Sequence, residues 1–481
     1  MNTQTVNNKK KQPQGMSPSM RTREIVGFLF GTILVFTLCY VLHINTLLGL
    51  FLLSLTIYFK YLYLTHNRLA YKLLNPSFLF VINFVTAYWL AQQKLPIFYL
   101  PYAAFPMLAT LLFPRLTIPF LLNLAAAVSL AFIFGNKLLV EVLFLISGIL
   151  SITLVVGARR RFTIIKAGLI IGFVQALSYL LLYPGDLIKH TTVYSAFFLN
   201  GLACSIIVLG TLSIFEYLFK TITNITLLEL SDFNQPLLHR LMLEVPGTYH
   251  HSLIVGNLSE AACEAINANA LLARIGAYYH DIGKLEKPEY FSENQDLSQS
   301  KHDELSPTMS KLVIMNHVKE GIELAKRSRL NPAIINFIHQ HHGNSLVYYF
   351  YRRAVESVEE DQKIQEEGFR YPGPKPNSKE TAVVLLADSV EAATRALKEP
   401  NPAKIEEVVH KIINNKFIDG QLDECELTLK DLEQISKVFI RILNSIYHVR
   451  ITYPEANVEN NHKKPAKENS HQSDKDKEVN L

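Results

Sequence analysis

Apolar residues dominate the first half of the chain, and charged residues interrupt them only rarely. Between Glu24 and Lys220 the acidic residues are limited to Glu141, Asp186 and Glu216, whereas the second half is rich in charge. A helix needs about 20 apolar residues to cross a bilayer. The pattern therefore predicts eight membrane spans, at approximately 25–44, 46–64, 77–91, 97–113, 116–134, 138–156, 162–182 and 192–219.

The fourth predicted span differs from the others because four prolines punctuate it. These are Pro96, Pro101, Pro106 and Pro114. Proline removes a helical hydrogen bond, which a membrane protein tolerates where neighbouring groups satisfy the freed carbonyl. The segment is therefore either a kinked span or a re-entrant piece.

The basic residues between the spans predict the orientation of the chain. With the N-terminus inside, the inner loops carry Lys60, Arg68, Lys72, Arg115 and the run 159–161, whereas the outer loops carry only Lys94, Lys137 and Lys189. Loops on the cytoplasmic side carry the excess of Lys and Arg. We therefore expect the N-terminus and everything after the last span to be cytoplasmic.

The remaining segments divide by composition. The polar composition of residues 1–24 and 453–481 predicts that both tails are disordered. Between the tails lie the predicted membrane domain, 25–219, and the predicted second domain, 243–452. Residues 220–242 form an amphipathic linker, broken near Pro236, that transmits a signal, pairs two protomers, or simply packs as a spacer.

Helical periodicity continues through the second domain. Apolar residues recur at three- and four-residue spacing, and no alternating strand pattern competes with them. The predicted helices are 252–267, 270–279, 306–328, 332–341, 346–365, 379–397, 402–415 and 429–446. The fold class is therefore all-α, a transmembrane helical bundle followed by a soluble helical domain.

Composition narrows the chemistry. The net charge of +5 is modest and requires no nucleic acid polymer as a partner. The four cysteines, Cys39, Cys204, Cys263 and Cys425, lie far apart, which argues against a disulfide framework or a thiolate zinc site. Any metal must be held by histidine and carboxylate.

Histidines are concentrated in one part of the second domain. Nine of the sixteen lie between positions 239 and 342. The strongest candidate ligands are His251, His280, Asp281, His317, His341, His342 and Asp388. They fall on different helices or helix ends, and a bundle brings such side chains together in its core. We leave out His239, His250, His302 and His339 as structural, although His250 could orient its neighbour.

This set of ligands favours a site with two metal ions. A carboxylate such as Asp281 can bridge two cations, and two divalent cations about 3.5–4 Å apart are used to hydrolyse phosphate esters. Histidine and carboxylate without thiolate suit Mn²⁺ or Fe²⁺ better than structural zinc. Lys284, Arg370 and Lys375 are candidates to bind a substrate phosphate, with solvated charges as the equal alternative, and Lys284 could share the catalytic work of Asp281.

Four motifs carry a resemblance to a known family. They are Val-Pro-Gly-Thr-Tyr-His-His-Ser, Ala-Tyr-Tyr-His-Asp-Ile-Gly-Lys, Phe-Arg-Tyr-Pro-Gly-Pro-Lys-Pro and Leu-Ala-Asp-Ser-Val-Glu-Ala-Ala. Together they resemble the HD phosphohydrolase superfamily, and more narrowly the bacterial seven-transmembrane HD-domain proteins of the PgpH type. That resemblance implies a multi-pass protein of the bacterial cell (inner) membrane that hydrolyses cyclic di-AMP to pApA with hydroxide activated by two metals.

By the resemblance, one metal takes His251, His280, Asp281 and Asp388, and the other takes Asp281, His317, His341 and His342. A related branch cleaves cyclic di-GMP and has Gly-Tyr-Pro after its tandem histidines, where this chain has Gly343-Asn344-Ser345-Leu346. One feature departs from the family, which places a large extracellular domain between its first two spans. Here only about three residues, 43–45, separate them.

Alternative functions remain open at this point. The chain could be a non-catalytic membrane receptor that binds a nucleotide, or a phosphodiesterase for cyclic di-GMP or another nucleotide. A complete set of ligands favours the enzyme. The expected partners are a cyclic dinucleotide, the lipid bilayer and a second copy of the chain, paired through the linker or the HD domain.

Overall fold

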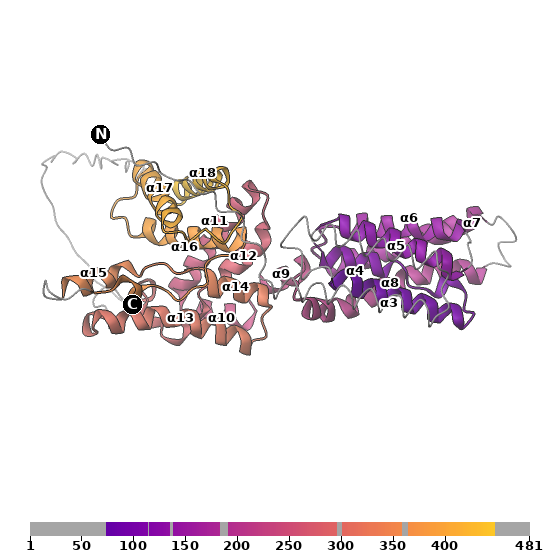
Figure 1. The fold of residues 1–481 in the computed structure, drawn as a ribbon, viewed down its shortest axis with the longest axis horizontal. Helices are drawn as coiled ribbons and strands as arrows, with labels where there is room; N and C mark the ends of the chain where they lie inside the picture. The colour runs from indigo at the N-terminus through magenta and orange to yellow at the C-terminus, as the bar shows by residue number, and fades with distance from the viewer. Residues whose placement is uncertain are drawn as a thin grey trace, which may run out of the picture.

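The computed structural model describes residues 74–113, 115–134, 138–182, 191–295, 301–357 and 364–447. Throughout this part the chain is helical, and its one extended pairing is an isolated bridge between Leu346 and Arg370. The prediction of an all-α protein is therefore confirmed. Both tails and the first two predicted spans lie outside the described residues. Figure 1 shows two helical bundles placed end to end, with α9 (Asn224–Leu230) between them.

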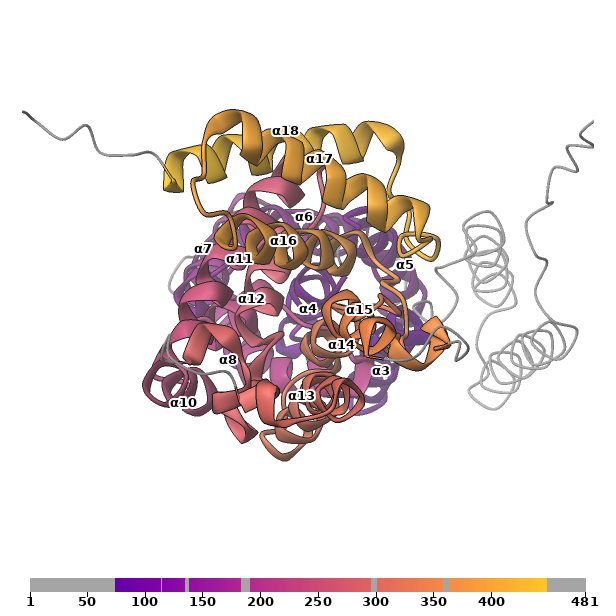
Figure 2. The same cartoon turned by 90° about the vertical axis from the view of Figure 1, so that its left-hand side faces the viewer.

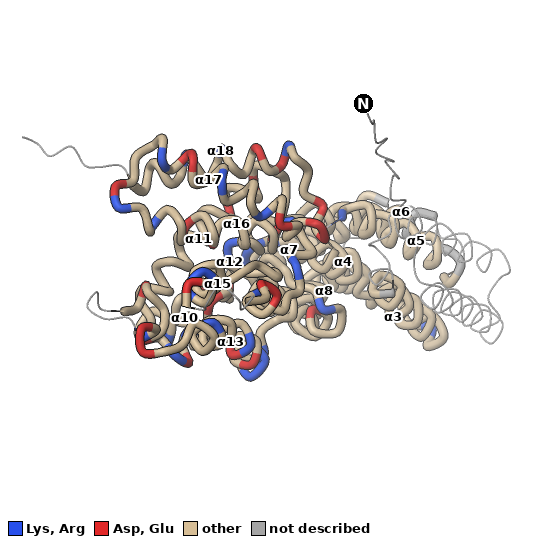
Figure 3. Tube along the Cα trace, turned by 60° about the vertical axis from the view of Figure 1, so that its left-hand side comes forward, with Lys and Arg blue, Asp and Glu red and all other residues tan. Residues whose placement is uncertain are grey.

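The first bundle contains the remaining six predicted spans. Its long helices are α3 (Leu74–Gln92), α5 (Thr117–Phe134), α6 (Leu138–Val155), α7 (Arg161–Leu182) and α8 (Thr191–Phe219). Of the described residues, the segments Arg161–Leu181 and Thr191–Phe219 are helices long and apolar enough to cross a membrane by themselves. Figure 3 shows that charged residues are sparse on this bundle and dense on the other. Large apolar side chains such as Phe173 and Ile206 face outward, as suits contact with lipid.

The proline-rich fourth segment is a broken span. It consists of the short 3₁₀ helix η2 (Ile97–Tyr99) followed by α4 (Ala104–Leu112). Asn200 of α8 donates its amide N–H groups to the carbonyls of Phe98 and Leu100, at 2.9 Å each. Irregular backbone is tolerated at membrane depth where protein groups satisfy it, so Asn200 stabilises the break that the prolines predict.

Polar contacts define the end of the first bundle that faces the second. Asn75, at the start of α3, donates to the carbonyl of Phe219 at the end of α8. Arg161, at the start of α7, forms a two-point ion pair with Glu229 of α9, at 2.7 and 3.1 Å. Arg161, the last residue of the basic run 159–161, therefore lies beside the linker.

The linker is broken into two helices, as predicted. The first, α9, is capped by the side chain of Thr223, and Glu216 of α8 accepts hydrogen bonds from the Thr223 amide and the Thr226 hydroxyl. The second, α10 (Pro236–Glu244), has proline at its first position, where no helical hydrogen bond is lost. Glu216 therefore ties the last membrane helix directly to the linker.

The second bundle is built around α16 (Lys379–Arg395). The other helices are α11 (Pro246–Ala265), α12 (Ala270–Tyr279), α13 (Pro307–Arg327), α14 (Pro332–Gln340), α15 (Tyr348–Glu356), α17 (Pro402–Ile418) and α18 (Leu429–Ile446). Figure 2 shows α17 and α18 covering α16. Residues 382–387 of α16 are completely buried, because an uninterrupted apolar run has no face for solvent.

In the second bundle, two predicted helices differ from the structure by more than three residues at one end. The helix predicted at 252–267 begins at Pro246, because proline is well suited to the first turn of a helix. The helix predicted at 346–365 is only nine residues long and ends at Glu356. The first difference matters for the site, because it places His251 inside α11 rather than before it.

Candidate metal centre

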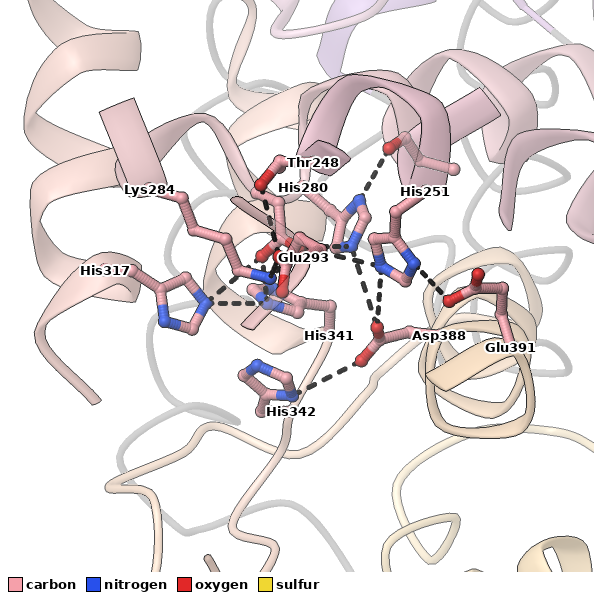
Figure 4. A network of polar contacts seen from close by, with 12 residues as sticks. Thr248, His251, His280, Lys284, Glu293, His317, His341, His342, Asp388 and Glu391 are labelled. Carbon is pink, nitrogen blue, oxygen red and sulfur yellow. Dashed lines mark hydrogen bonds and ion pairs between the residues drawn. The ribbon is translucent and has the colours of Figure 1, made fainter. Parts of the chain in front are cut away.

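All seven predicted ligand residues come together in the core of the second bundle. His251, His317 and Asp388 project from α11, α13 and α16, whereas His280-Asp281 and His341-His342 follow the ends of α12 and α14. Their side chains form two groups with ligand atoms within 4.8 Å of one another. One group contains His251, His280 and Asp388, and the other contains Asp281, His317, His341 and His342. Figure 4 shows the arrangement.

Asp281 lies between the two groups and turns one oxygen toward each. Its Oδ2 is 3.2 Å from His280 Nε2 and 3.7 Å from His251 Nε2. Its Oδ1 is 3.3 Å from His317 Nε2 and 3.5 Å from His341 Nε2. Asp281 is 1% exposed as a residue, so it is shielded from water. This is the position that a bridging carboxylate requires.

The backbone fixes the orientation of three imidazole rings. The Nδ1 atoms of His280 and His317 donate to the carbonyls of Ala277 and Ile314, both at 2.6 Å, and His341 Nδ1 donates to Ile338 at 2.9 Å. Each bond spans three residues, as a helix end permits. A ring that donates through Nδ1 presents the lone pair of Nε2 to the centre, as a metal ligand must.

His251 is oriented differently, by a side chain rather than by the backbone. Its Nδ1 hydrogen-bonds to Oε2 of Glu391, and its Nε2 lies 3.1 Å from Oδ1 of Asp388. Glu391 is 1% exposed and stands three residues after Asp388, on the same face of α16. Sequence reasoning missed Glu391, although the spacing Asp-x-x-Glu was a usable signal. His250, the neighbour expected to orient His251, is exposed instead.

Lys284 does not face open solvent but forms ion pairs with two buried carboxylates. Its Nζ lies 2.8 Å from Asp281 Oδ2 and 2.6 Å from Glu293 Oε1. Burial would raise the pKa of Glu293, but Lys284 outweighs it and lowers that pKa to about 2. Thr248 of α11 adds a hydrogen bond to Glu293 at 3.1 Å. Neither Glu293 nor Thr248 was predicted.

Glycines allow the elements around the centre to approach closely. A Cβ at Gly283, two residues after Asp281, would lie 1.8 Å from the carbonyl oxygen of His317. A Cβ at Gly247 would lie 1.9 Å from the carbonyl oxygen of Glu293. Any side chain at these positions would force the backbone apart. The Gly after His280-Asp281 is thus needed for α13 to deliver His317.

The charges of the centre suit a cation. Burial opposes ionisation of Asp281 and Asp388, but the surrounding histidines, with Lys284 at Asp281, hold the pKa of both carboxyls well below the usual range. Burial lowers the pKa of His341 and His342, so these rings are neutral at neutral pH. Two buried atoms, His280 Nε2 and Asp281 Oδ1, have no hydrogen-bond partner among the described residues. Such atoms are costly unless something binds them.

The two other predicted phosphate-binding residues are engaged elsewhere. Arg370 is paired with Asp419 at 2.9 Å and with Glu366, and it also donates to the carbonyl of Asn344. Lys375 lies 3.4 Å from Asp423. Neither side chain contacts the two groups of ligands in the described structure. The residue of their motif that does is Tyr371, whose ring stacks on His342 with centroids 4.4 Å apart.

Two family models match separate parts of the chain. The family described as "7TM receptor with intracellular HD hydrolase" matches residues 28–223, and the HD domain matches residues 248–393. Residues 248–393 contain all seven predicted ligands together with Glu293, Tyr371 and Glu391. Both halves of the chain thus have relatives, in the order membrane region then HD domain.

Individual relatives agree with the family models. The cyclic-di-AMP phosphodiesterase PgpH of Bacillus subtilis (strain 168) is 39% identical over 425 residues, 85% of this chain and 59% of that protein. The protein of the same name from Listeria monocytogenes is 40% identical over 324 residues, 66% of this chain and 44% of that protein. The chain therefore spans about half the length of these relatives.

One solved structure is also similar in sequence. The crystal structure of the L. monocytogenes PgpH HD domain in complex with cyclic-di-AMP is 45% identical. The alignment covers 46% of this chain and 100% of that one, with a TM-score of 0.43.

Proposed function

We propose that this chain, which belongs to the family of seven-transmembrane receptors with an intracellular HD hydrolase domain, is a membrane-bound phosphodiesterase that hydrolyses cyclic di-AMP to pApA. The observation that carries the proposal is the position of Asp281, whose two oxygens face two separate groups of ligands. A plain binding module has no need of such a centre. The membrane domain occupies 25–219, the linker 220–242 and the HD domain 243–452.

The residues present fit two divalent metal ions. His251, His280, Asp281 and Asp388 would hold one, and Asp281, His317, His341 and His342 would hold the other. Nitrogen and carboxylate oxygen without thiolate favour Mn²⁺ or Fe²⁺. When bound, two such ions supply the positive charge and the activated water that phosphodiester hydrolysis needs.

The protein's own contribution is to hold these ligands without allowing them to rearrange. Backbone carbonyls fix three imidazoles, and Glu391 fixes the fourth, His251. We assign Lys284 a positioning role rather than direct contact with substrate, because both of its partners are buried carboxylates. It offsets the negative charge of Asp281 and Glu293 and keeps Asp281 from rotating away from either group.

The substrate is inferred from the relatives and from one missing motif. Both PgpH relatives are cyclic-di-AMP phosphodiesterases by name, and the tandem histidines here are followed by Gly343-Asn344-Ser345-Leu346 rather than Gly-Tyr-Pro. The HD domain faces the cytoplasm in this proposal, where a cyclic dinucleotide would be available. A homodimer through the linker or the HD domain remains a prediction.

A competition experiment tests the choice of substrate. The full chain in detergent, loaded with Mn²⁺, receives equal amounts of cyclic di-AMP and cyclic di-GMP, and chromatography follows both. We expect cyclic di-AMP to disappear first, with pApA as the product. Preferential loss of cyclic di-GMP would reject the substrate, and binding of either nucleotide without turnover would favour the receptor alternative.

A further inference from the structure

The phenol of Tyr371 lies beside the ligand clusters, and none of the contacts described above gives it a task. The residue is 8% exposed, and its ring stacks on His342 at an interplanar angle of 28° and meets His317 edge-on with centroids 6.4 Å apart. Its backbone N–H donates to the carbonyl of Ser345 at 3.0 Å, three residues after His342. The tyrosine is therefore fixed at both backbone and ring against the segment that carries the tandem histidines.

The phenol of Tyr371 lies close enough to the centre to interact electrostatically with its charged residues. Burial raises the pKa of this phenol, Lys284 lowers it, and Asp388 and Asp281 raise it, so the group lies within electrostatic reach of residues on both sides of the site. A phenol can donate a hydrogen bond. Tyr371 is 8% exposed, and its hydroxyl oxygen is not one of the sealed side-chain atoms that lack a partner in the described part of the chain. The hydroxyl is therefore accessible to a ligand.

The neighbouring residues explain why Tyr371, rather than a cation, fills this position. Arg370 and Lys375 of the same motif are paired with Asp419 and Asp423, and Lys284 is paired with Asp281 and Glu293. These three cations are thus already paired with carboxylates. A neutral donor remains, beside His342, whose side chain is the most exposed of the histidines in the two groups at 23%. That is the side from which a substrate can approach.

From this geometry we propose that the Tyr371 hydroxyl binds substrate directly, by donating a hydrogen bond to a non-bridging oxygen of the phosphodiester. The inference rests on the proposed function in that it takes the HD site to be a phosphodiesterase centre. It goes further by naming a group that contacts substrate and is not a metal ligand. A hydrogen bond to a charged phosphoryl oxygen is worth a factor of about 10 to 100 in binding or rate.

The test removes the hydroxyl and keeps the ring. Tyr371→Phe retains stacking on His342, and Tyr351→Phe is the matched control, because Tyr351 packs on Phe369 at 5.9 Å and lies in neither ligand group. The full chain in detergent is loaded with Mn²⁺ and assayed with cyclic di-AMP and with bis(p-nitrophenyl) phosphate, a generic phosphodiester. Metal content, melting temperature and affinity for inorganic phosphate are measured on the same preparations.

We expect Tyr371→Phe to lose about 10- to 100-fold in kcat/KM on both diesters and about tenfold or more in phosphate affinity. Metal content and melting temperature should match the control. Wild-type phosphate affinity in Tyr371→Phe would overturn the inference, as would a loss confined to cyclic di-AMP, since both diesters carry the non-bridging oxygen. If the wild type cleaves only bis(p-nitrophenyl) phosphate, the proposed substrate is wrong while the role of Tyr371 is still decided by that assay. If it cleaves neither, phosphate affinity alone decides it.

Discussion

The Nε2 atoms of His317 and His341 lie 3.1 Å apart in the core of the HD domain. Each ring already donates through Nδ1 to a backbone carbonyl, so in the neutral form both facing nitrogens carry a lone pair. Two lone pairs at this distance repel each other unless a proton or a cation lies between them. Asp281 Oδ1 lies within 3.5 Å of both nitrogens, and its negative charge favours a cation in the space between them.

This relationship predicts that divalent metal stabilises the folded protein. Adding Mn²⁺ to chelator-treated protein should raise the melting temperature, because a ligand that binds only the folded state contributes about 2.7 kcal/mol at 100 times its Kd. His317→Ala should reduce the increase and lower the metal content, read by elemental analysis. His339→Ala is the control, since His339 belongs to neither group. An unchanged response in His317→Ala would contradict the assignment.

Glu391 is expected to act on the metal through His251. Glu391→Gln retains the size of the side chain but removes the charge that favours the required tautomer of His251. Losses of this kind usually cost 10- to 100-fold in metal affinity or activity, so we expect about that range. Metal titration monitored by turnover measures it, with Glu407→Gln, at an exposed position of α17, as the control. Equal metal affinity in the two variants would show that Glu391 is merely structural.

The ion pair of Glu293 with Lys284 should make stability depend on acid pH. The pKa of Glu293 is lowered from 4.5 to about 2, so its stabilising contribution is complete above about pH 4.5 and is lost as the pH falls toward 2. Near neutral pH this amounts to the order of 3 kcal/mol.

Glu293→Gln should therefore melt at a lower temperature than the wild type at pH 7, and the gap should narrow below pH 4.5. The matched control is Glu289→Gln, which removes only an exposed pair with Lys301 at 3.6 Å. A gap that stays constant between pH 7 and pH 3 would show that the charge of Glu293 is not responsible.

The pair Arg161–Glu229 should couple the membrane domain to the HD domain. Both side chains are about half exposed, so the pair adds only about 0.2–1 kcal/mol to stability. It nevertheless joins α7 to α9, which leads into the HD domain. Arg161→Glu should change turnover of the full chain by about two- to fivefold, and adding Glu229→Arg should restore it.

The control for this pair is the same exchange at Arg352 and Glu356, an exposed pair within α15. Turnover is measured in liposomes at low salt, because salt screens exposed pairs. If the double exchange at Arg161 and Glu229 fails to restore the rate, this ion pair does not couple the membrane domain to the HD domain.

The sequence was sufficient to identify the residues that come together at the candidate metal centre, but not the residues that support them. His280-Asp281 and the tandem His341-His342 stand out because the residue types themselves carry the metal chemistry. Glu293 and Glu391 look like any helix or loop carboxylate, and only tertiary packing shows that they are buried. Arg370 and Lys375 were predicted to bind a substrate phosphate, but in the structure they are paired with Asp419 and Asp423. Only the fold brings these aspartates close to them.

In the membrane half, too, the sequence predicted a local feature but not the distant contact that supports it. The prolines of the fourth span predicted a disturbed helix, and the structure has η2 and α4 there. The contact that makes the break tolerable comes from Asn200, about 100 residues later, and no local pattern identifies it. The first two spans, including the short connection at 43–45, lie outside the described residues and stay predictions.

The central claim is that Asp281 joins two metal sites that together hydrolyse cyclic di-AMP. Its most direct test compares the Mn²⁺-loaded wild type with Asp281→Asn, which keeps the shape but not the charge, measuring bound metal and pApA on one preparation. We expect two metals per chain and pApA from the wild type, and a loss of more than about 100-fold in turnover, with loss of metal, in the variant. Full turnover by Asp281→Asn with two metals bound would contradict the account.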